Sequence, residues 1–402
     1  MAVSTVGSSA AGIVYPLLIL ALTNSPAAVG VATALRIVPY LLLSLPVGAW
    51  VDRWDRRRLM LRCDVALAIV VGTLPVAMAW GETHLWHLYA VALAEGTLMV
   101  FYNLAQVASL PRVVATEQLP QATAHNQAGR AAAEIAGPAI GTGLYQLSRA
   151  LPFAVDALSH LFSAWTLWRL RTDFAPRPLG PRRPLLAEVA EGLRWLWGER
   201  LVRHMALLTC GLNFVEAAVP LLLIVLAREQ GASAAQIGLI FSLAGVGGVL
   251  GAMAGSPVQR RFSFGAVIIG VVAIHALLMP MIALCMGPLS LGVVFGLIMF
   301  FGPVYNVVQL SYRIALIPDG LQGRVHAGFR LTANLLFPVG AYLCGVLIER
   351  WGVLPTLAAF CVVQVVLTLL VLIDKVIREA PRAPVREPVR APDREALRVC
   401  AD

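Results

Sequence analysis

The chain has 402 residues, of which 59% are hydrophobic and 13% are charged. An ordinary soluble domain carries about 25% charged residues, so a soluble fold could not hide this much apolar surface. The formal net charge of +9 comes from 31 basic and 22 acidic residues. Because the basic residues stand in short segments between long apolar blocks, they do not form the basic face of a nucleic-acid-binding protein.

Apolar blocks recur along the chain, and each is long enough to cross a bilayer, which takes about 20 residues of helix. The first six cover residues 3–22, 28–51, 65–80, 88–110, 127–145 and 153–168. The second six cover residues 205–226, 237–254, 264–285, 289–312, 325–348 and 353–373. The sequence therefore predicts an all-α integral membrane protein of about twelve transmembrane helices in two pseudo-symmetric six-helix bundles.

These blocks divide the chain into four parts. Residues 1–170 are the N-terminal bundle, 171–203 a linker, 204–374 the C-terminal bundle and 375–402 a basic tail. Apolar and charged residues alternate at helical spacing over 185–205, which predicts an amphipathic helix on the membrane surface. The tail repeats Pro and Arg without apolar periodicity, so we expect disorder there.

Basic residues fix the expected orientation, because cytoplasmic loops carry most of the Arg and Lys. The loops after odd-numbered blocks offer only Arg149, Arg228 and Arg350, whereas the other side holds the linker, the tail and the remaining basic loops. Both termini and the linker are therefore expected in the cytoplasm of a bacterium, with the protein spanning the cytoplasmic (inner) membrane.

Two internal sequence repeats support a duplicated architecture. The pattern Arg130-x7-Pro138 recurs 200 residues later as Arg330-x7-Pro338. A glycine followed by two arginines after the second block also recurs after the eighth, at Gly48, Arg57, Arg58 and at Gly251, Arg260, Arg261.

The loop after the second block, residues 48–58, reads Gly-Ala-Trp-Val-Asp-Arg-Trp-Asp-Arg-Arg-Arg and resembles the signature loop of the major facilitator superfamily. Asp55 stands where that pattern usually has a second glycine, as in the drug and siderophore exporter branch. We expect Gly48 to permit close helix contact. The resemblance implies that the loop latches the two halves on the cytoplasmic side, through Gly48, Asp52, Arg53, Arg56 and Arg57.

The fifth block contains Ala-Gly-Pro-Ala-Ile-Gly-Thr-Gly at residues 136–143, which resembles the Gly-Pro motif of the superfamily's exporters. Gly137, Pro138 and Gly141, with Arg130 upstream, carry the match; Ala133 and Thr142 replace glycines of the usual motif. The resemblance points to carriers of the enterobactin-exporter and macrolide-efflux type, and it implies export without naming the substrate.

Ionisable residues inside spans are costly and tend to mark ion pairs or transport routes. Arg36 and Glu95 lie at similar depth, so we expect them to pair, either for structure or as a switch. Arg130 and Glu134 have the spacing of a local ion pair. Asp156 and His160 repeat that spacing, which favours a polar contact at the outer edge over a proton relay.

Glu216 lies mid-depth in the seventh block, one turn after Asn213, with no basic residue in that block. A carboxyl group in a low-dielectric medium tends to hold its proton and to release it when water reaches the site, as proton antiport requires. Glu216 and Glu95 are therefore the leading candidates for proton coupling, ahead of Arg36, Glu134, Asp156 and His160.

The superfamily resemblance also implies that the first, fourth, seventh and tenth spans line a central cavity. Polar residues on these spans are candidate substrate contacts, although interhelical hydrogen bonds worth under about 2 kcal/mol each would explain them equally well. They are Tyr102, Asn103, Gln106, Asn213, Tyr305, Asn306 and Gln309.

The pattern as a whole favours a secondary active transporter that exports an amphipathic small molecule, such as a drug, macrolide or siderophore, by proton antiport and alternating access. An uptake carrier or an uncoupled facilitator of a small nutrient is the alternative. A polytopic enzyme is less favoured because no catalytic or metal-binding cluster appears, and no ATP-binding Gly-x4-Gly-Lys segment exists. We expect no cofactor or metal, energy from the proton motive force, and a monomer that contacts its substrate and the bilayer.

Overall fold

The computed structural model describes residues 2–51, 54–113, 118–169, 185–318 and 321–380. All regular elements in these residues are helices. Those before the linker are α1 (Ala2–Thr23), α2 (Pro26–Val51), α3 (Arg56–Ala79), α4 (Leu85–Val113), α5 (Leu119–Leu147) and α6 (Leu151–Arg169). Those from the linker onward are α7 (Leu185–Gly198), α8 (Arg200–Glu216), α9 (Val219–Glu229), α10 (Ala234–Arg261), α11 (Phe264–Met281), the 3₁₀ turn η2 (Ile282–Leu284), α12 (Pro288–Leu316), α13 (Gln322–Asn334), α14 (Phe337–Trp351), α15 (Val353–Ile373) and α16 (Lys375–Arg378).

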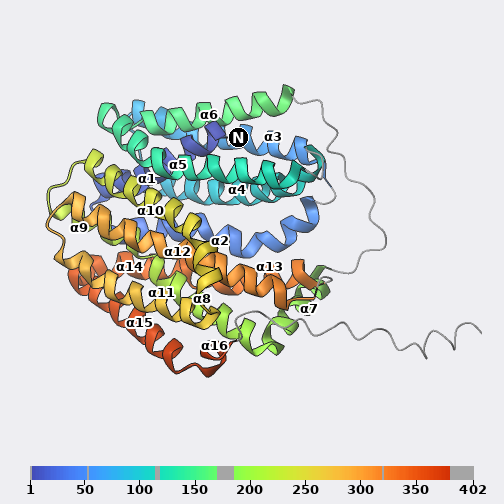
Figure 1. Cartoon of the computed structure of the whole chain (residues 1–402). Coiled ribbons are helices and arrows are strands. Elements are labelled where there is room, and N and C mark those ends of the chain that lie inside the picture. Colours follow the sequence, from blue (N-terminus) through green and yellow to red (C-terminus); the bar gives the residue numbers. More distant parts are fainter. Residues whose placement is uncertain (1, 52–53, 114–117, 170–184, 319–320, 381–402) are drawn as a thin grey trace, which may run out of the picture.

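The helices form two bundles that lie side by side, α1–α6 in one and α8–α15 in the other (Figure 1). Within the first bundle α2 packs on α4 and α3 on α6, and within the second α10 packs on α12 and α11 on α15. The most extensive contacts between the bundles are those of α2 with α14 and of α5 with α10. The matching pairs confirm the predicted pseudo-symmetric halves.

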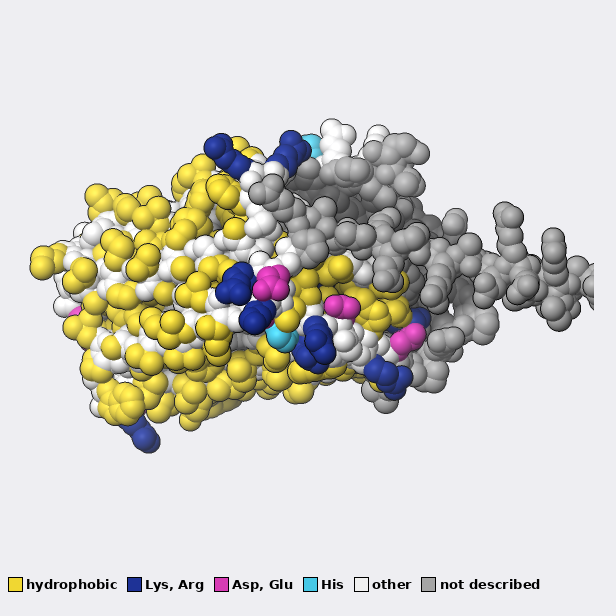
Figure 2. All heavy atoms as spheres, turned by 60° about the horizontal axis from the view of Figure 1, so that its bottom comes forward, with side chains coloured by type: hydrophobic (Ala, Val, Ile, Leu, Met, Phe, Trp, Pro, Cys, Tyr) yellow, Lys and Arg dark blue, Asp and Glu magenta, His cyan; other side chains and the backbone are white. Residues whose placement is uncertain are grey.

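Ten of the described helical segments are long and apolar enough to cross a membrane. They include every predicted span except those of α5 and α6. Helix α5 carries more polar residues, and α6 has only 19 residues. Figure 2 shows a broad apolar surface, with most of the charged side chains in view gathered toward one end of the molecule. We call this end, where α7 lies, the linker end, and the opposite end the loop end.

Two predicted spans are broken helices. The seventh block is divided into α8 and α9 around residues 217–218, and the eleventh into α13 and α14 around residues 335–336. Each second segment begins with a proline, Pro220 or Pro338, in its first turn, where the missing N–H is tolerated. The proline of the other repeat copy, Pro138, lies inside the unbroken α5.

The linker helix α7 packs against other helices of the protein. α7 contacts α13 and α8, Leu196 is fully buried, and Arg324 on α13 bonds Glu191 at 2.8 Å. The predicted helix over 185–205 breaks at Glu199, where α8 begins one residue later.

The first residues of the tail are helical rather than disordered. α16 is capped by Asp374, and its Ile377 is buried in the second bundle because Gly265 leaves room for the chain. Residues 381–402, which hold the rest of the predicted tail, lie outside the described residues.

The hydrophobic core is shared by both bundles at the loop end and divided at the linker end. One cluster of buried residues joins the loop-end halves of α1, α2 and α4 to those of α9, α10, α12 and α14. Toward the linker end the buried residues separate into one cluster per bundle. The molecule is therefore sealed at the loop end, and its interior cavities extend toward the linker end.

Candidate functional site

A cavity of about 600 Å³ lies between the bundles. Its wall is mainly apolar, with Phe241, Phe295 and Met299 from the second bundle. The first bundle contributes Ser9 from α1 and Glu134 and Pro138 from α5. A site of this size with few polar groups suits a small organic ligand.

Glu216 faces this cavity at the break between α8 and α9. Its side chain is exposed to the cavity, and no hydrogen bond or ion pair holds it within the described residues. Glu134 of α5 lines the same cavity and is also exposed. Two carboxyl groups from opposite bundles thus face one largely apolar space.

The two helix breaks lie against each other. Asn213 of α8 donates from its side-chain amide to the backbone oxygen of Ala333 at 2.9 Å, close to the end of α13. This bond satisfies a carbonyl near the helix break, and broken membrane helices commonly frame transport sites. Asn213 also lines the cavity, so both of its predicted roles have a structural basis.

The polar residues of α12 divide into two kinds. Tyr305 and Asn306 line the cavity, and Asn306 is exposed there. Gln309 is buried behind them and donates to Thr209 at 2.7 Å and to the Tyr305 hydroxyl at 3.1 Å. Gln309 therefore joins α8 to α12, as the packing alternative predicted.

A second cavity of about 570 Å³ lies nearer α2 and α4 and is lined by Arg36, Tyr40 and Asn103. Arg36 forms an ion pair with Glu95 of α4, which confirms the predicted pairing. The Glu95 side chain is 9% exposed and that of Arg36 is 33% exposed. The arginine thus reaches the cavity while the carboxyl group is buried behind it.

A third cavity of about 360 Å³ lies in the first bundle toward the linker end. It is lined by the predicted contacts Tyr102, Asn103 and Gln106 together with Arg130 and Glu134. The expected Arg130–Glu134 ion pair is absent from the described contacts. Both side chains are exposed to cavity space, where solvation replaces the pairing.

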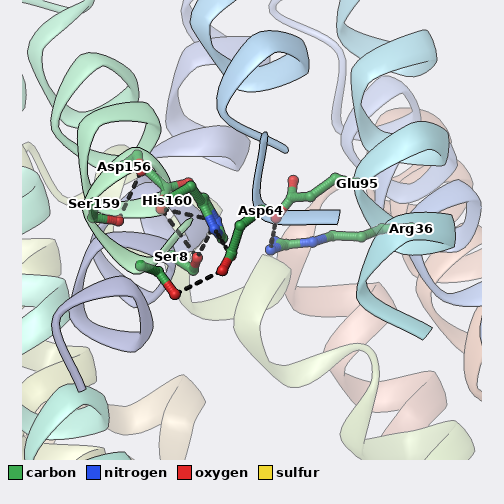
Figure 3. Close-up of polar contacts among 8 residues, drawn as sticks. Ser8, Arg36, Asp64, Glu95, Asp156, Ser159 and His160 are labelled. Carbon is green, nitrogen blue, oxygen red and sulfur yellow. Dashed lines mark hydrogen bonds and ion pairs between the residues drawn. The ribbon is translucent and has the colours of Figure 1, made fainter. Parts of the chain in front are cut away.

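A buried polar cluster joins α1, α3 and α6 (Figure 3). His160 of α6 lies between Asp64 of α3, at 3.0 Å from Nδ1, and Asp156 of its own helix, at 3.6 Å from Nε2. Ser8 of α1 donates to Asp156 at 3.0 Å, and Ser163 donates to Asp64 at 2.7 Å. The predicted contact between Asp156 and His160 is present, but its expected place at the outer edge is wrong, because both residues are buried between three helices.

The sequence analysis did not identify Asp64 as a site residue, because the predicted third span begins one residue later, at residue 65. In the structure α3 begins at Arg56, where Asp55 caps it by accepting bonds from the backbone of Arg57 and Arg58. Asp64 then lies two turns inside the helix and is fully buried. The sequence does carry a helix-start signal at Asp55, ten residues before the predicted span begins at residue 65.

A comparison of the sequence with known families accounts for this architecture. The profile described as Major Facilitator Superfamily matches residues 1–335. The chain belongs to the Major Facilitator Superfamily.

Relatives within the superfamily are transporters named for efflux. Multidrug efflux pump Tap of Mycobacterium tuberculosis is 25% identical over 94% of this chain and 92% of its own length. Enterobactin exporter EntS of Escherichia coli O1:K1 / APEC is 25% identical over 85% and 82%. Macrolide efflux protein A of Streptococcus pyogenes is 25% identical, and the match spans only 36% of that protein. The chain is therefore a multi-pass membrane transporter and not an enzyme.

Solved structures agree on the fold. The nucleoside transporter NupG superposes with a TM-score of 0.73 at 13% identity, over 92% of this chain and 96% of that one. A bacterial homolog of the human lysosomal transporter Spinster, in an inward-facing and unoccupied conformation, gives 0.72 at 12% identity, over 92% and 93%.

The superfamily signature loop is attached to its own bundle. Arg56 donates to the Ala108 oxygen at 2.6 Å, and Arg57 donates to the Leu167 oxygen at 2.8 Å. Asp52 and Arg53 lie outside the described residues, so the latch between halves stays a prediction. The close contact expected at Gly48 is wrong, because no described atom lies within 4 Å of a Cβ placed there, at an end where the bundles diverge.

The Gly-Pro motif of α5 lies between α1 and α10. A Cβ on Gly137 would collide with Ser9, and one on Gly141 with the backbone of Ala10. On the other side, Gly238 of α10 lies against the Pro138 oxygen. The small residues therefore permit close contact both within the first bundle and across the boundary between halves.

Proposed function

We propose that this superfamily member is a proton antiporter that exports an amphipathic small molecule by alternating access of its two halves. The linker end faces the cytoplasm, because the basic loops, the linker and both termini lie on that side of the sequence topology. The protein then resides in the bacterial inner membrane and is described in its state open toward the cytoplasm.

The observation that carries this proposal is the Glu216 carboxyl group, which has no hydrogen-bond or ion-pair partner among the described residues and lies in the wall of an apolar cavity between the halves. An apolar cavity accepts the hydrophobic part of a ligand, and a few polar groups orient it. Asn306 is exposed in the same cavity and offers hydrogen bonds to a ligand. An amphipathic organic molecule matches this lining better than a small polar nutrient does.

Glu216 also supplies the chemistry of exchange. An ionised carboxylate in an apolar wall is costly, so the empty site favours a bound proton. A ligand that brings a positive or hydrogen-bond-donating group removes the need for that proton. Proton and substrate would then occupy the site alternately, which is what antiport requires.

The loop end supplies the closed gate. Glu349 of α14 accepts hydrogen bonds from the Ser25 hydroxyl at 2.5 Å and from the Ala27 backbone at 3.2 Å, at the start of α2. Export requires these contacts between halves to open while the linker end closes. The efflux names of the relatives support the outward direction.

Substitution of Glu216 tests the proposal in cells. We expect that a bacterium lacking its own efflux pumps accumulates less labelled macrolide or siderophore when it expresses the protein. Glu216→Gln should abolish this reduction, whereas Glu82→Gln, at an exposed carboxyl group in the loop after α3, should preserve it.

Two other results would contradict the proposal. Higher accumulation on expression indicates an uptake carrier. Full activity of both Glu216→Gln and Glu95→Gln, including after collapse of the proton motive force, indicates an uncoupled facilitator.

A further inference from the structure

The cluster of Asp64, Asp156 and His160 lies away from the cavity that holds Glu216, and the mechanism above does not use it. All three side chains are nearly inaccessible to solvent, at 0%, 1% and 4% relative exposure. They come from α3 and α6, and Ser8 of α1 bridges two of them. A polar cluster this deep in a membrane bundle is costly unless its charges balance.

The charges of the cluster do not balance without bound protons. Two ionised carboxylates beside a neutral imidazole would leave two uncompensated negative charges in a low-dielectric interior. A protonated His160 compensates one, and a further proton shared with Asp64 or Asp156 compensates the other. Arg36 does not supply the missing charge, because Glu95 already pairs with it.

The cluster has a route to solvent at one end. His160 and Ser8 line the third cavity, which extends toward the linker end. On the other side Asp156 lines a narrow gap together with Arg36 and Glu95. Arg36 in turn lines the second cavity, between the bundles. The cluster thus lies between the linker-end cavity and the Arg36–Glu95 pair beside the second cavity.

Helix α1 is the element that could open or close this site. Its Gly7 lies so close to α6 that a Cβ there would be 3.0 Å from the Asp156 carboxylate. The next residues, Ser8 and Ser9, contact the cluster and the Glu216 cavity respectively. Movement of α1 between the two states would therefore alter both sites together.

We propose that Asp64, Asp156 and His160 form a second proton-binding site, located in the first bundle, which is loaded from the linker end and coupled to the substrate cavity through α1. The inference rests on the proposed proton antiport. It adds a proton-binding site outside the cavity that holds Glu216, and its three members act on that cavity through α1.

Other charged or titratable groups surround the cluster and bear on its protonation. Those on the neighbouring helices, or across the third cavity from it, are Arg36, Cys63, Glu95, Tyr102, His125, Arg130 and Glu134.

Transport with and without a pH gradient separates proton binding from structure. The full-length protein would be reconstituted in vesicles, and a labelled macrolide followed both in gradient-driven accumulation and in counterflow at equal pH. We expect Asp64→Asn and His160→Gln to lose gradient-driven accumulation and to keep counterflow. Asp374→Asn should keep both, because it alters an Asp–His contact of 2.7 Å with His204 outside the cluster.

Retained gradient-driven accumulation in both cluster variants would overturn the inference. Loss of counterflow to the same extent would also overturn it, because the cluster would then only hold the bundle together. Asp64→Glu provides a check on folding, since it keeps the carboxyl group and should restore the gradient response in part.

A measurement without substrate keeps the two proposals distinguishable. Acid-minus-alkaline infrared difference spectra of the ligand-free protein in lipid should show carboxyl signals that Asp64→Asn and Asp156→Asn each remove. A wild-type protein that ignores the pH gradient contradicts antiport, and these spectra then decide the cluster's proton binding on their own. Spectra unchanged by both substitutions would contradict the inference even if antiport holds.

Discussion

At the residue scale, three glutamates show two ways of holding a charged side chain inside the bundles: one is paired with a base, and two are exposed to a cavity. Glu95 is buried and paired with Arg36, while Glu216 and Glu134 are exposed to the interior cavity. Uncompensated charge in low dielectric is costly, which explains both arrangements.

The Arg36–Glu95 pair predicts an asymmetry between its two partners. Arg36→Ala leaves a buried carboxylate without compensation and should cost about 3 kcal/mol, as breaking a buried pair does. Glu95→Ala leaves an arginine that still reaches the second cavity and should cost less. Thermal unfolding of the purified variants measures the order, and a larger loss for Glu95→Ala would contradict the assigned burial.

The pair itself could be predicted from depth, because Arg36 and Glu95 lie equally far into neighbouring spans of the same direction. The contact between Asp64 and His160 could not be predicted in the same way. It depends on which faces of α3 and α6 meet, and a single sequence gives the depth of a residue without the rotation of its helix.

At the scale of the helices, close packing between neighbours depends on small residues. Two glycines of α5 provide a matched test of this dependence. A Cβ at Gly141 would collide with the backbone of Ala10 on α1, whereas one at Gly143 would meet nothing within 4 Å. Gly141→Val should therefore destabilise the protein by about 1–3 kcal/mol through overpacking, and it should also impair transport. Gly143→Val should do neither.

Thermal unfolding and transport of these two variants measure the difference. Equal effects would mean that the contact between α1 and α5 does not depend on the Gly-Pro motif.

Apolar block length predicted the helices well, because the bilayer demands continuous hydrogen-bonded helix. The breaks after α8 and α13 were not predicted, since Pro220 and Pro338 stand in apolar runs that a helix can accommodate with a kink. The structure shows that both helices are interrupted and that Asn213 joins the two breaks by a hydrogen bond. This same arrangement places Glu216 at the cavity wall.

The whole molecule is held shut at the loop end by one continuous core and by the hydrogen bonds that Glu349 of α14 accepts from the start of α2. Loss of a helix-capping group costs about 1 kcal/mol, or roughly fivefold in an equilibrium. Glu349→Ala should therefore shift the population toward the state open at the loop end.

A buried reporter at the loop end measures that shift. Leu20 is 3% exposed in the shared core. In a variant whose native cysteines are replaced, Leu20→Cys should react with a membrane-impermeant thiol reagent severalfold faster when Glu349→Ala is added. Glu229 and Glu349 both line a pocket at the loop end, and Glu229→Ala should leave the rate unchanged. Equal rates with and without Glu349→Ala would exclude Glu349 from the gate.

Coupling of proton flow to export is the central claim, and one measurement tests it most directly. The purified protein in vesicles with an imposed pH gradient would be followed for proton flux and for movement of a macrolide and siderophore panel at the same time. We predict proton flux that appears only with a transported compound and is lost in Glu216→Gln. Movement of a compound that is indifferent to the gradient, without accompanying proton flux, would contradict antiport.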